Sequence, residues 1–171
     1  MRSDRISVLF ICTHNSARSQ IAEGLLNALF GDSFEAFSAG TEPTTVHPMA
    51  VKAMAELGID ISRAGSKSVD GFRERKLDYV VTVCDRAHQT CPFFAGGKHQ
   101  LHKGFGDPAR PGLDDATLLG LFRRTRDEIR DWLEKEFVPM AEAEGAFGRA
   151  GPGAPASVPD RIHFRFDRKD S

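Results

Sequence analysis

The 171-residue sequence lacks any apolar run of the roughly 20 residues that a membrane-spanning helix needs. It also lacks an excess of charge of either sign, because 23 basic and 24 acidic residues leave a formal net charge of -1. General attraction to nucleic acid or to anionic lipid depends on such an excess, so we expect neither nucleic acid nor a membrane as a partner. Any anion must be bound locally, by a few well-placed donors.

Cysteine is scarce as well, since the chain has three, Cys12, Cys84 and Cys91. An odd number argues against a framework of structural disulfides. The charged residues 1–5 lead into an apolar run that ends at Cys12, too early for a secretory signal with a small-residue cleavage site. We therefore expect a cytoplasmic protein, in which each thiol is either an inert core residue or a reactive group.

One domain of about residues 1–140 accounts for the segments with regular apolar patterns. The remainder, residues 141–171, is predicted to be an Ala/Gly/Pro-rich linker and a flexible tail. Eleven of the fifteen residues from Gly145 to Pro159 are Ala, Gly or Pro, a composition that cannot build a packed core. Apolar residues in 162–166 alternate with His and Arg, so this end forms either a disordered tail or a docking strand.

Strand and helix patterns alternate along the chain. Buried-strand patterns lie at Ile6–Ile11, Phe34–Phe37 and Asp78–Val83, with a short one at His99–Lys103. Helical spacing of apolar residues runs from near Ser19 past Leu29, over Pro48–Leu57 before Gly58, and from Asp114 past Phe137. The rest of Asp85–Gly112 is rich in Gly and Pro and is expected to be irregular. These patterns predict an α/β fold with a small central parallel sheet of about four strands, flanked by helices on both sides.

Two of the cysteines follow predicted strands directly. Cys12 comes after the first strand and Cys84 after the strand at Asp78–Val83. In parallel sheets the reactive loops gather at the carboxyl ends of the strands. We therefore expect Cys12 and Cys84 to lie at one edge of the sheet and to act together.

The segment from Cys12 to Ser19 is predicted to bind an oxyanion. It consists of Cys12, Thr13, His14, Asn15, Ser16, Ala17, Arg18 and Ser19. A loop that enters a helix offers unpaired backbone N–H groups, and the helix dipole favours negative charge there. Arg18 can then hold two oxygens of the anion, and the same field favours the thiolate of Cys12.

Two further side chains fit this loop. Asn15 tolerates a left-handed backbone turn, and Ser19 can cap the helix or point its hydroxyl at the sulfur. The alternative is a buried cysteine at a strand end followed by a surface arginine, a pairing that occurs by chance. The strand before the loop and the helix after it favour the functional interpretation.

The stretch Val8–Gly24, with the sequence VLFICTHNSARSQIAEG, resembles the start of the low-molecular-weight protein tyrosine phosphatase superfamily. Within it, the closer resemblance is to the thioredoxin-coupled arsenate reductases, and it spans roughly residues 6–140. This resemblance implies arsenate as substrate, phosphate and sulfate as competing oxyanions, and thioredoxin as the protein partner. It further implies a monomer without a cofactor, with a phosphatase-like phosphate-binding loop at the carboxyl edge of the sheet.

Six residues separate Cys84 from Cys91. A reductase must supply two electrons, and Cys84 can do so by attacking the sulfur that carries arsenic, after which Cys91 attacks Cys84. Two incidental cysteines or a metal pair are the alternatives, but metal-binding cysteines are usually closer and no third or fourth ligand is evident. The segment also resembles the redox segment of the arsenate reductases.

Asp107 precedes Pro108 in the loop-rich part of the chain. The resemblance implies that Asp107 is the general acid, although an Asp-Pro pair also forms turns for purely structural reasons. Tyrosine phosphatases of the superfamily carry aromatic residues after this pair, whereas Ala109 and Arg110 follow here. The single tyrosine, Tyr79, lies within a predicted strand, so the sequence gives little support to an aryl phosphate pocket.

Three residues near the loop depart from the family pattern or complete it. His14 stands where many relatives have glycine, and no role is assigned to it. Some of these arsenate reductases bind potassium through Glu and Asp; Glu23 matches one ligand, but Lys67 appears where an acidic residue is expected. Because the lysine ammonium can replace the cation, no metal is predicted.

The loop alone fits more than one activity. A phosphatase that hydrolyses phosphate monoesters would use Cys12 and Arg18 in the same way. A non-enzymatic oxyanion or redox sensor would bind the anion, or form a disulfide, without turnover. Cys84 and Cys91 favour the reductase over both.

Overall fold

The protein is described here from a computed structural model, which covers residues 4–91 and 94–149. Four strands form one sheet in the order β2-β1-β3-β4, and all neighbouring strands are parallel. The strands are β1 (Ile6–Cys12), β2 (Phe34–Gly40), β3 (Leu77–Thr82) and β4 (Gly97–His102). The helices are α1 (Arg18–Phe30), α2 (Pro48–Ala55), α3 (Asp85–Thr90), α4 (Asp115–Trp132) and α5 (Val138–Arg149), with the 3-10 turn η1 (Val69–Phe72) and the π turn η2 (Leu133–Phe137). The predicted α/β fold is therefore confirmed.

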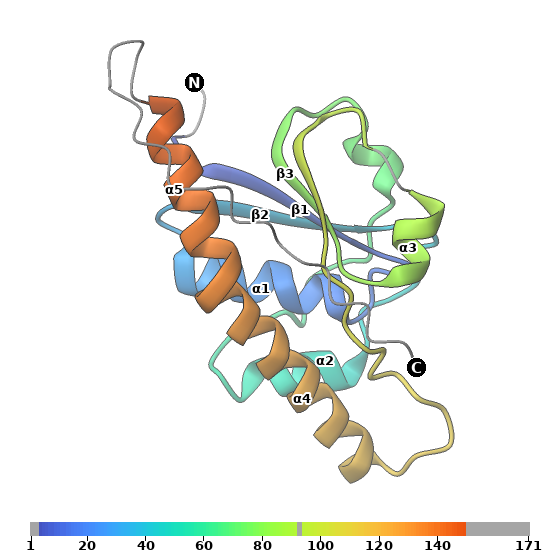
Figure 1. Ribbon diagram of the computed structural model, residues 1–171. Coiled ribbons are helices and arrows are strands. Elements are labelled where there is room, and N and C mark those ends of the chain that lie inside the picture. The colour runs from blue at the N-terminus through green and yellow to red at the C-terminus, as the bar shows by residue number, and fades with distance from the viewer. Residues whose placement is uncertain (1–3, 92–93, 150–171) are drawn as a thin grey trace.

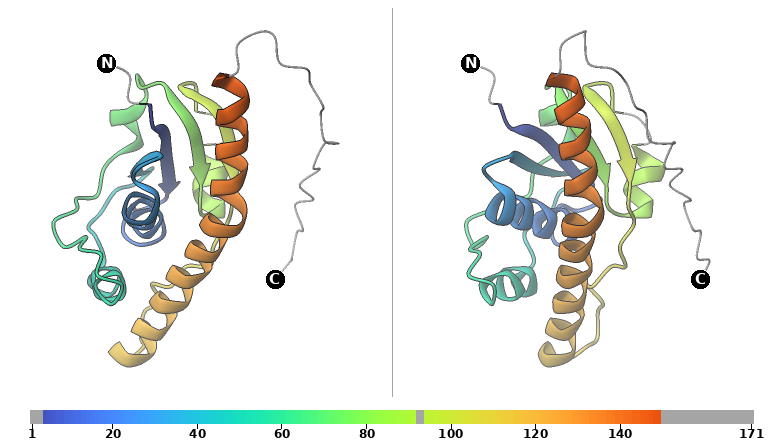
Figure 2. Two further views of the ribbon diagram at one scale, coloured as in Figure 1. Left: turned by 90° about the vertical axis from the view of Figure 1, so that its left-hand side faces the viewer. Right: turned by 60° about the vertical axis from the view of Figure 1, so that its left-hand side comes forward.

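Helices cover both faces of this sheet (Figures 1 and 2). On one face the rings of Phe10, Phe34 and Tyr79 lie 5.4 to 6.2 Å from the ring of Phe137. On the other face Phe37 lies 5.9 Å from Phe72 in η1. The alternation of side chains along parallel strands that are buried on both faces explains their nearly continuous apolar sequences.

The elements α4, η2 and α5 follow one another without a break and form one long C-terminal helix, which runs along one side of the molecule (Figure 2). It begins at the predicted position, where Asp114 accepts a hydrogen bond from the N–H of Thr117. Its π turn spans Leu133–Phe137 and inserts an extra residue into the helical repeat. Leu133 and Phe137, at the two ends of this turn, are both buried in the core.

Several boundaries differ from the prediction. β2 continues to Gly40 instead of ending at Phe37, because Gly40 pairs with Cys12. The turn η1 (Val69–Phe72) was not predicted, and α3 lies in the stretch expected to be irregular. The helix α3 has six residues, too few for a periodic pattern, and its N-cap is the thiol of Cys84, which accepts from the N–H of Ala87.

The C-terminal boundary is also later than predicted. The helix α5 continues to Arg149, so residues 141–149 are helical and the predicted linker does not begin at Gly145. Tyr79 donates a hydrogen bond to Glu144, which fastens this end of the helix to the sheet. The predicted tail at 150–171 lies outside the described residues. Within residues 4–91 and 94–149, none of the helices combines the length and the apolar character needed to cross a membrane.

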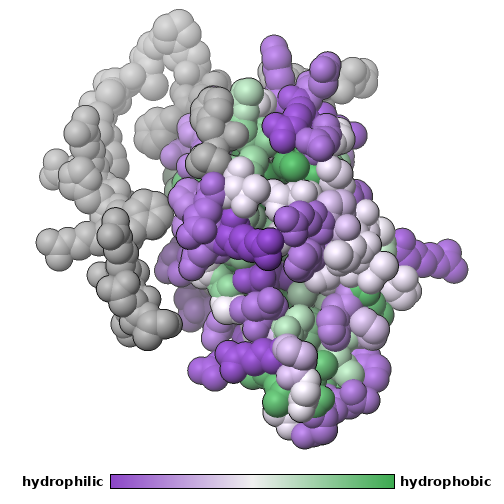
Figure 3. Space-filling model, turned by 90° about the vertical axis from the view of Figure 1, so that its right-hand side faces the viewer, coloured by the Kyte–Doolittle hydropathy of each residue, from purple (hydrophilic) through white to green (hydrophobic). Residues whose placement is uncertain are grey.

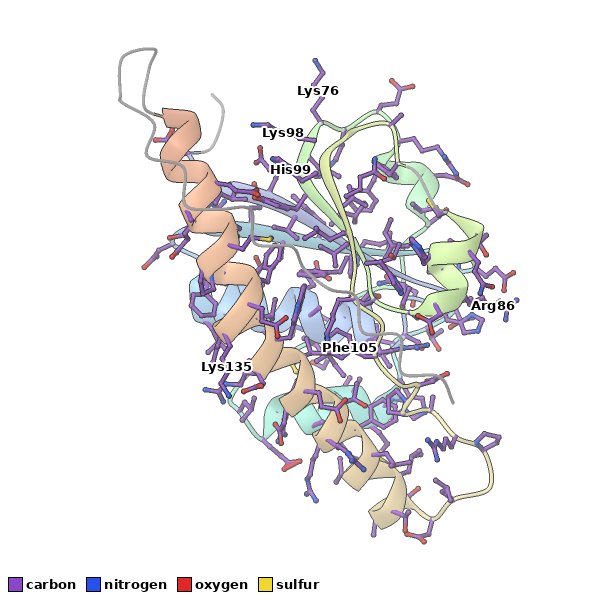
Figure 4. All side chains as sticks on the ribbon, viewed as in Figure 1. Lys76, Arg86, Lys98, His99, Phe105 and Lys135 are labelled. Atoms are coloured by element: carbon purple, nitrogen blue, oxygen red, sulfur yellow. The ribbon has the colours of Figure 1, made fainter. Side chains whose placement is uncertain are left out.

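The face that carries α3 is mostly hydrophilic (Figure 3). Hydrophobic side chains form small separate areas between the polar ones on this face. Asp85 and Arg86 of α3 are exposed, and Arg86 (Figure 4) forms an ion pair with Glu42, with 3.4 Å between Nη2 and Oε2.

Candidate active site

The loop between β1 and α1 has the conformation that its sequence predicts. Asn15 has a φ angle of 49°, in the left-handed region that asparagine tolerates better than most residues. Its side-chain oxygen accepts from the N–H of Lys67 at 2.8 Å and from Gln20 Nε2 at 3.0 Å. These bonds hold the strained residue in place although it is completely buried.

Residues 41–47 hold the same loop in place through backbone hydrogen bonds. The N–H groups of Thr41, Glu42, Thr44 and His47 donate to the carbonyl oxygens of residues 12, 13, 14 and 16 at 2.8 to 3.2 Å. Within the described part of the chain, the backbone bonds of the loop thus use its carbonyl groups, and its N–H groups remain available for an anion.

Gly40 allows this close approach of the two segments. A Cβ atom at residue 40 would lie 2.7 Å from the carbonyl oxygen of Thr13 and 2.9 Å from the nitrogen of Asn15. Neither backbone atom can move without opening the loop. A side chain at residue 40 would therefore distort the candidate anion site.

The start of α1 strengthens the attraction for an anion. Ala17 is the N-cap, and among the described residues no side chain caps the helix. Ser19 lies within the first turn instead of at the predicted cap position. The first N–H groups of α1 and its dipole thus face the loop without a competing side-chain acceptor.

Cys12 is almost completely buried at the base of this loop, with 3% of its surface exposed. Its sulfur lies 2.8 Å from Ser19 Oγ, and Ser19 Oγ in turn accepts from Asn15 Nδ2 at 2.8 Å. Because Asn15 supplies one proton to this hydroxyl, the hydroxyl proton itself can point to the sulfur. A hydrogen bond donated to sulfur stabilises the thiolate, the reactive form of cysteine.

Arg18 and Asp107 come together over the loop. Arg18 Nη1 donates to the carbonyl oxygen of Phe105 at 3.0 Å, and Arg18 Nη2 lies 3.6 Å from Asp107 Oδ2. The ring of Phe105 (Figure 4) packs against Trp132 of α4. This contact anchors the segment between β4 and α4 that carries Asp107. The carboxyl group of Asp107 is about half exposed, so it can exchange protons with solvent.

A conservative change of Arg18 tests its predicted contact with the anion. Arg18→Lys is expected to weaken phosphate binding about 10- to 100-fold, because lysine cannot hold two oxygens with a planar fork. Isothermal titration with inorganic phosphate measures the change. Arg110→Lys is the control. Arg110 is exposed in the segment between β4 and α4, and this variant should bind phosphate like the wild type. Equal affinities for all three proteins would contradict the assignment of Arg18.

Cys84 lies next to the loop, as the strand order requires. β1 and β3 are neighbours, and the N–H of Val83 donates to the carbonyl oxygen of Ile11 at 2.8 Å. The sulfur of Cys84 lies 3.4 Å from Thr13 Oγ1, one residue after Cys12. The predicted shared edge for Cys12 and Cys84 is confirmed.

Cys91 lies at the other end of α3. Its N–H donates to the carbonyl oxygen of Ala87 at 2.8 Å, and its side chain is partly buried, whereas Cys84 is 2% exposed. All three cysteines are free of disulfide bonds. A helical rise of about 1.5 Å per residue separates Cys84 and Cys91 by roughly 10 Å. A disulfide needs about 4.4 to 6.8 Å between Cα atoms, so joining them requires α3 to change its conformation.

Glu23 and Lys67 form a charged pair beside the loop. Lys67 Nζ lies 3.8 Å from Glu23 Oε2 and donates to the carbonyl oxygen of Gly65 at 2.9 Å. Burial raises the pKa of Glu23, while the hydrogen bond from Ser38 and the charge of Lys67 act in the opposite direction. The ammonium group already supplies the positive charge at Glu23, so these residues do not fit an additional metal cation.

Removing the charge of Lys67 should make the ionised form of Glu23 more costly. A carboxyl group with a raised pKa favours folding below its unfolded pKa, and this contribution is lost as pH rises through the folded pKa. Lys67→Met is therefore expected to lower the free energy of unfolding by up to about 1 kcal/mol at pH 8 and by less at pH 4. Urea unfolding at both pH values, in potassium or sodium chloride, measures the effect.

Lys76→Met is the matched control, since Lys76 directly precedes β3, at the end of the sheet away from the loop, and points into solvent (Figure 4). Potassium should restore part of the stability of Lys67→Met and leave the wild type unchanged. A loss of stability that is the same at both pH values would show that Lys67 contributes packing and not charge.

Some residues lie near the loop although no motif in the sequence marks them as part of the site. Gln20 is 1% exposed and connects Asn15 to the carbonyl oxygen of Gly65. His47 caps α2, and burial lowers its pKa while the charge of Asp107 opposes this. His14 is exposed, with Nδ1 3.1 Å from the carbonyl oxygen of Glu42, and no role follows from this contact.

Comparisons with known proteins agree with the fold. The sequence model of the low molecular weight phosphotyrosine protein phosphatase family matches residues 7–142. An arsenate reductase of Halalkalibacterium halodurans is 46% identical over 122 residues, which are 71% of this chain and 88% of that protein.

Solved structures give the same result. An arsenate reductase in its phosphate-binding state has 30% identity and a TM-score of 0.67, covering 78% of this chain and 98% of that one. A thioredoxin-dependent arsenate reductase of Corynebacterium glutamicum has 32% identity and a TM-score of 0.59, covering 81% of this chain and 65% of that one.

The chain therefore belongs to the low molecular weight phosphotyrosine protein phosphatase family. Within this family it belongs with the arsenate reductases.

Proposed function

We propose that this protein reduces arsenate to arsenite through Cys12, Cys84 and Cys91 and is regenerated by thioredoxin. The observation that carries the proposal is the position of Cys84, whose sulfur lies 3.4 Å from the side chain of Thr13 beside Cys12. A phosphatase needs water and an acid at this place, but no second thiol. The arsenate reductases among its relatives support the same choice.

In the first step, the N–H groups of the loop and Arg18 bind arsenate in line with Cys12. The Cys12 thiolate attacks arsenic, and an oxygen of arsenate leaves as water after it receives a proton from Asp107. The product is an adduct in which the sulfur of Cys12 is bonded to As(V). Phosphate and sulfate, which have the same tetrahedral shape, compete for the loop.

In the second step, the Cys84 thiolate attacks the sulfur of Cys12. The sulfur–arsenic bond breaks and its electron pair stays on arsenic, so that As(V) becomes As(III) and leaves as arsenite. The two electrons come from the two thiols, which become the Cys12–Cys84 disulfide. The third thiol, Cys91, then attacks Cys84 and releases Cys12 as a thiolate.

Thioredoxin completes the cycle by reducing the Cys84–Cys91 disulfide. Two features support this partner: α3 is exposed to solvent, and Cys91 is more accessible than the other two cysteines. The relative from Corynebacterium glutamicum is a thioredoxin-dependent enzyme. The proposal includes a cytoplasmic location, where thioredoxin keeps thiols reduced, and a monomeric enzyme.

A coupled assay tests this function directly. Arsenate, thioredoxin, thioredoxin reductase and NADPH are added to the wild type, and NADPH oxidation is compared with the arsenite formed. We expect one NADPH per arsenite and little hydrolysis of an aryl phosphate. Brisk aryl phosphate hydrolysis without arsenite would identify a phosphatase instead. Oxyanion binding without turnover under any reductant would identify a sensor.

A further inference from the structure

A cavity of about 340 Å³ lies between α3 and the strands β3 and β4, on the side of the sheet away from Cys12. His88 of α3 and Cys91, the C-cap residue of α3, line it, together with Thr82 of β3 and His102 of β4. Residues three apart on a helix are neighbours, with Cβ atoms about 5 to 6 Å apart. His88 and Cys91 are three residues apart at the end of α3, where the N–H of the C-cap residue Cys91 still donates to the carbonyl oxygen of Ala87, and both line this cavity, which is large enough to hold water.

The hydrogen bonds of this cluster determine where its protons lie. The carboxylate of Asp85 can only accept, so His102 Nε2, at 2.8 Å from Asp85 Oδ1, carries a proton. In neutral His102 the other nitrogen, Nδ1, is then an acceptor. Thr82 Oγ1 lies 2.8 Å from it and 3.4 Å from the carbonyl oxygen of Leu101, and the shorter contact takes the hydroxyl proton.

The hydrogen bonds of Thr82 also determine where the proton of neutral His88 lies. Having donated its proton, Thr82 Oγ1 acts as an acceptor, and His88 Nδ1 at 3.4 Å is the donor. The rings of His88 and His102 are stacked at 4.2 Å with 19° between their planes, which fixes the orientation of His88. Its second nitrogen, Nε2, therefore carries a lone pair and can accept a proton in the cavity that Cys91 lines.

We propose that His88 accepts the proton of the Cys91 thiol while α3 is still folded, before Cys91 attacks Cys84. This inference rests on the proposed function, because it concerns one step of the disulfide relay. Cys91 first loses its proton to His88 Nε2. When α3 then changes its conformation, the sulfur of Cys91 bonds to that of Cys84, and Cys12 leaves as a thiolate. Thr82, His102 and Asp85 position His88 for this transfer.

The same chain of bonds provides an exit for the proton. His88 passes the proton of Nδ1 to Thr82, Thr82 passes its own to His102 Nδ1, and His102 passes the proton of Nε2 to Asp85. The side chain of Asp85 is 82% exposed, so it releases the proton to water. After these transfers His88 is again neutral.

One further charge faces Cys91. Arg73, which follows η1, has a raised pKa chiefly because of its bond to Asp70, and the Cys91 charge adds a smaller effect in the same direction. Arg73 is itself paired with Asp70, its Nε lying 2.6 Å from Asp70 Oδ1.

The test follows the two disulfides during a single turnover without thioredoxin. Wild type and His88→Gln are mixed with arsenate at pH 7, quenched with acid, alkylated and analysed by mass spectrometry. In His88→Gln, formation of the Cys12–Cys84 disulfide should be unchanged and formation of the Cys84–Cys91 disulfide roughly 10-fold slower. This factor follows because an ordinary cysteine is only a few per cent thiolate at pH 7.

The pH profile separates a proton acceptor from a structural role. Above about pH 9 an ordinary thiol ionises without help, so the two proteins should become equally fast. His99→Gln is the control, since His99 stacks on Tyr79 outside the cavity, and it should behave like the wild type at every pH. An unchanged Cys84–Cys91 step in His88→Gln, or a deficit that does not depend on pH, would overturn the proposal.

A second measurement is independent of arsenate. With Cys12 and Cys84 both replaced by serine, the alkylation rate of Cys91 by iodoacetamide should rise at lower pH with His88 than with glutamine at residue 88. Identical profiles would overturn the pairing of His88 with Cys91. Failure of the wild type to form the Cys12–Cys84 disulfide would instead overturn the proposed function, and the alkylation profiles would then decide on His88 alone.

Discussion

Cys12→Ser is expected to abolish arsenite formation, with the rate falling by on the order of 10⁴-fold or more. The serine hydroxyl is not ionised at neutral pH and cannot form the disulfide that supplies electrons to arsenic. Quantifying arsenite in the coupled assay measures the loss. Residual arsenite above the background without enzyme would show that another group is the nucleophile.

Phosphate binding is the control for this variant. Serine is close to cysteine in size, and the N–H groups of the loop, the start of α1 and Arg18 are unchanged. Titration with phosphate should therefore give an affinity within a fewfold of the wild type. A large loss of phosphate binding would mean that the substitution disrupts the loop, and the kinetic result would then not identify the nucleophile.

Cys84→Ser is expected to stop thioredoxin-coupled turnover almost completely, by roughly 10³-fold or more. The adduct on Cys12 can still form, but no neighbouring thiol attacks it. In a single turnover this variant should release no arsenite. The reason lies in the position of Cys84, whose sulfur is beside the loop residue Thr13, whereas Cys91 is at the far end of α3.

Cys91→Ser is the matched control for this experiment. It keeps Cys84, so it should release about one arsenite per enzyme and accumulate the Cys12–Cys84 disulfide without further turnover. The contrast between the two variants orders the thiols along the relay. If Cys84→Ser also released one arsenite per enzyme, Cys91 would be the direct partner of Cys12 and the proposed order would be wrong.

The positions of Cys12 and Cys84, which follow strands directly, could be predicted from the sequence. β-branched and aromatic runs predict β1 and β3, and parallel strands end at a shared edge, which is why Cys12 and Cys84 could be placed together. The left-handed conformation of Asn15 also follows from local chemistry, because few other side chains tolerate it. The helix α3 was not predicted, since six residues next to prolines and glycines carry no period.

The loop from Cys12 to Arg18 was thus determined by the sequence itself, through residue types and spacings that act over a few neighbours. What holds this loop depends on residues far along the chain: the segment 41–47, which binds its carbonyl groups, and Phe105 and Asp107, which meet Arg18.

The cavity at Cys91 was likewise decided by tertiary structure alone. His88 is six residues from Thr82 in sequence and His102 is twenty, and only the parallel pairing of β3 and β4 beneath α3 brings them together. Turn chemistry and periodicity act locally and can be recognised in a single sequence. Contacts across a sheet depend on how whole elements pack. No local pattern in a single sequence predicts which distant residues then meet.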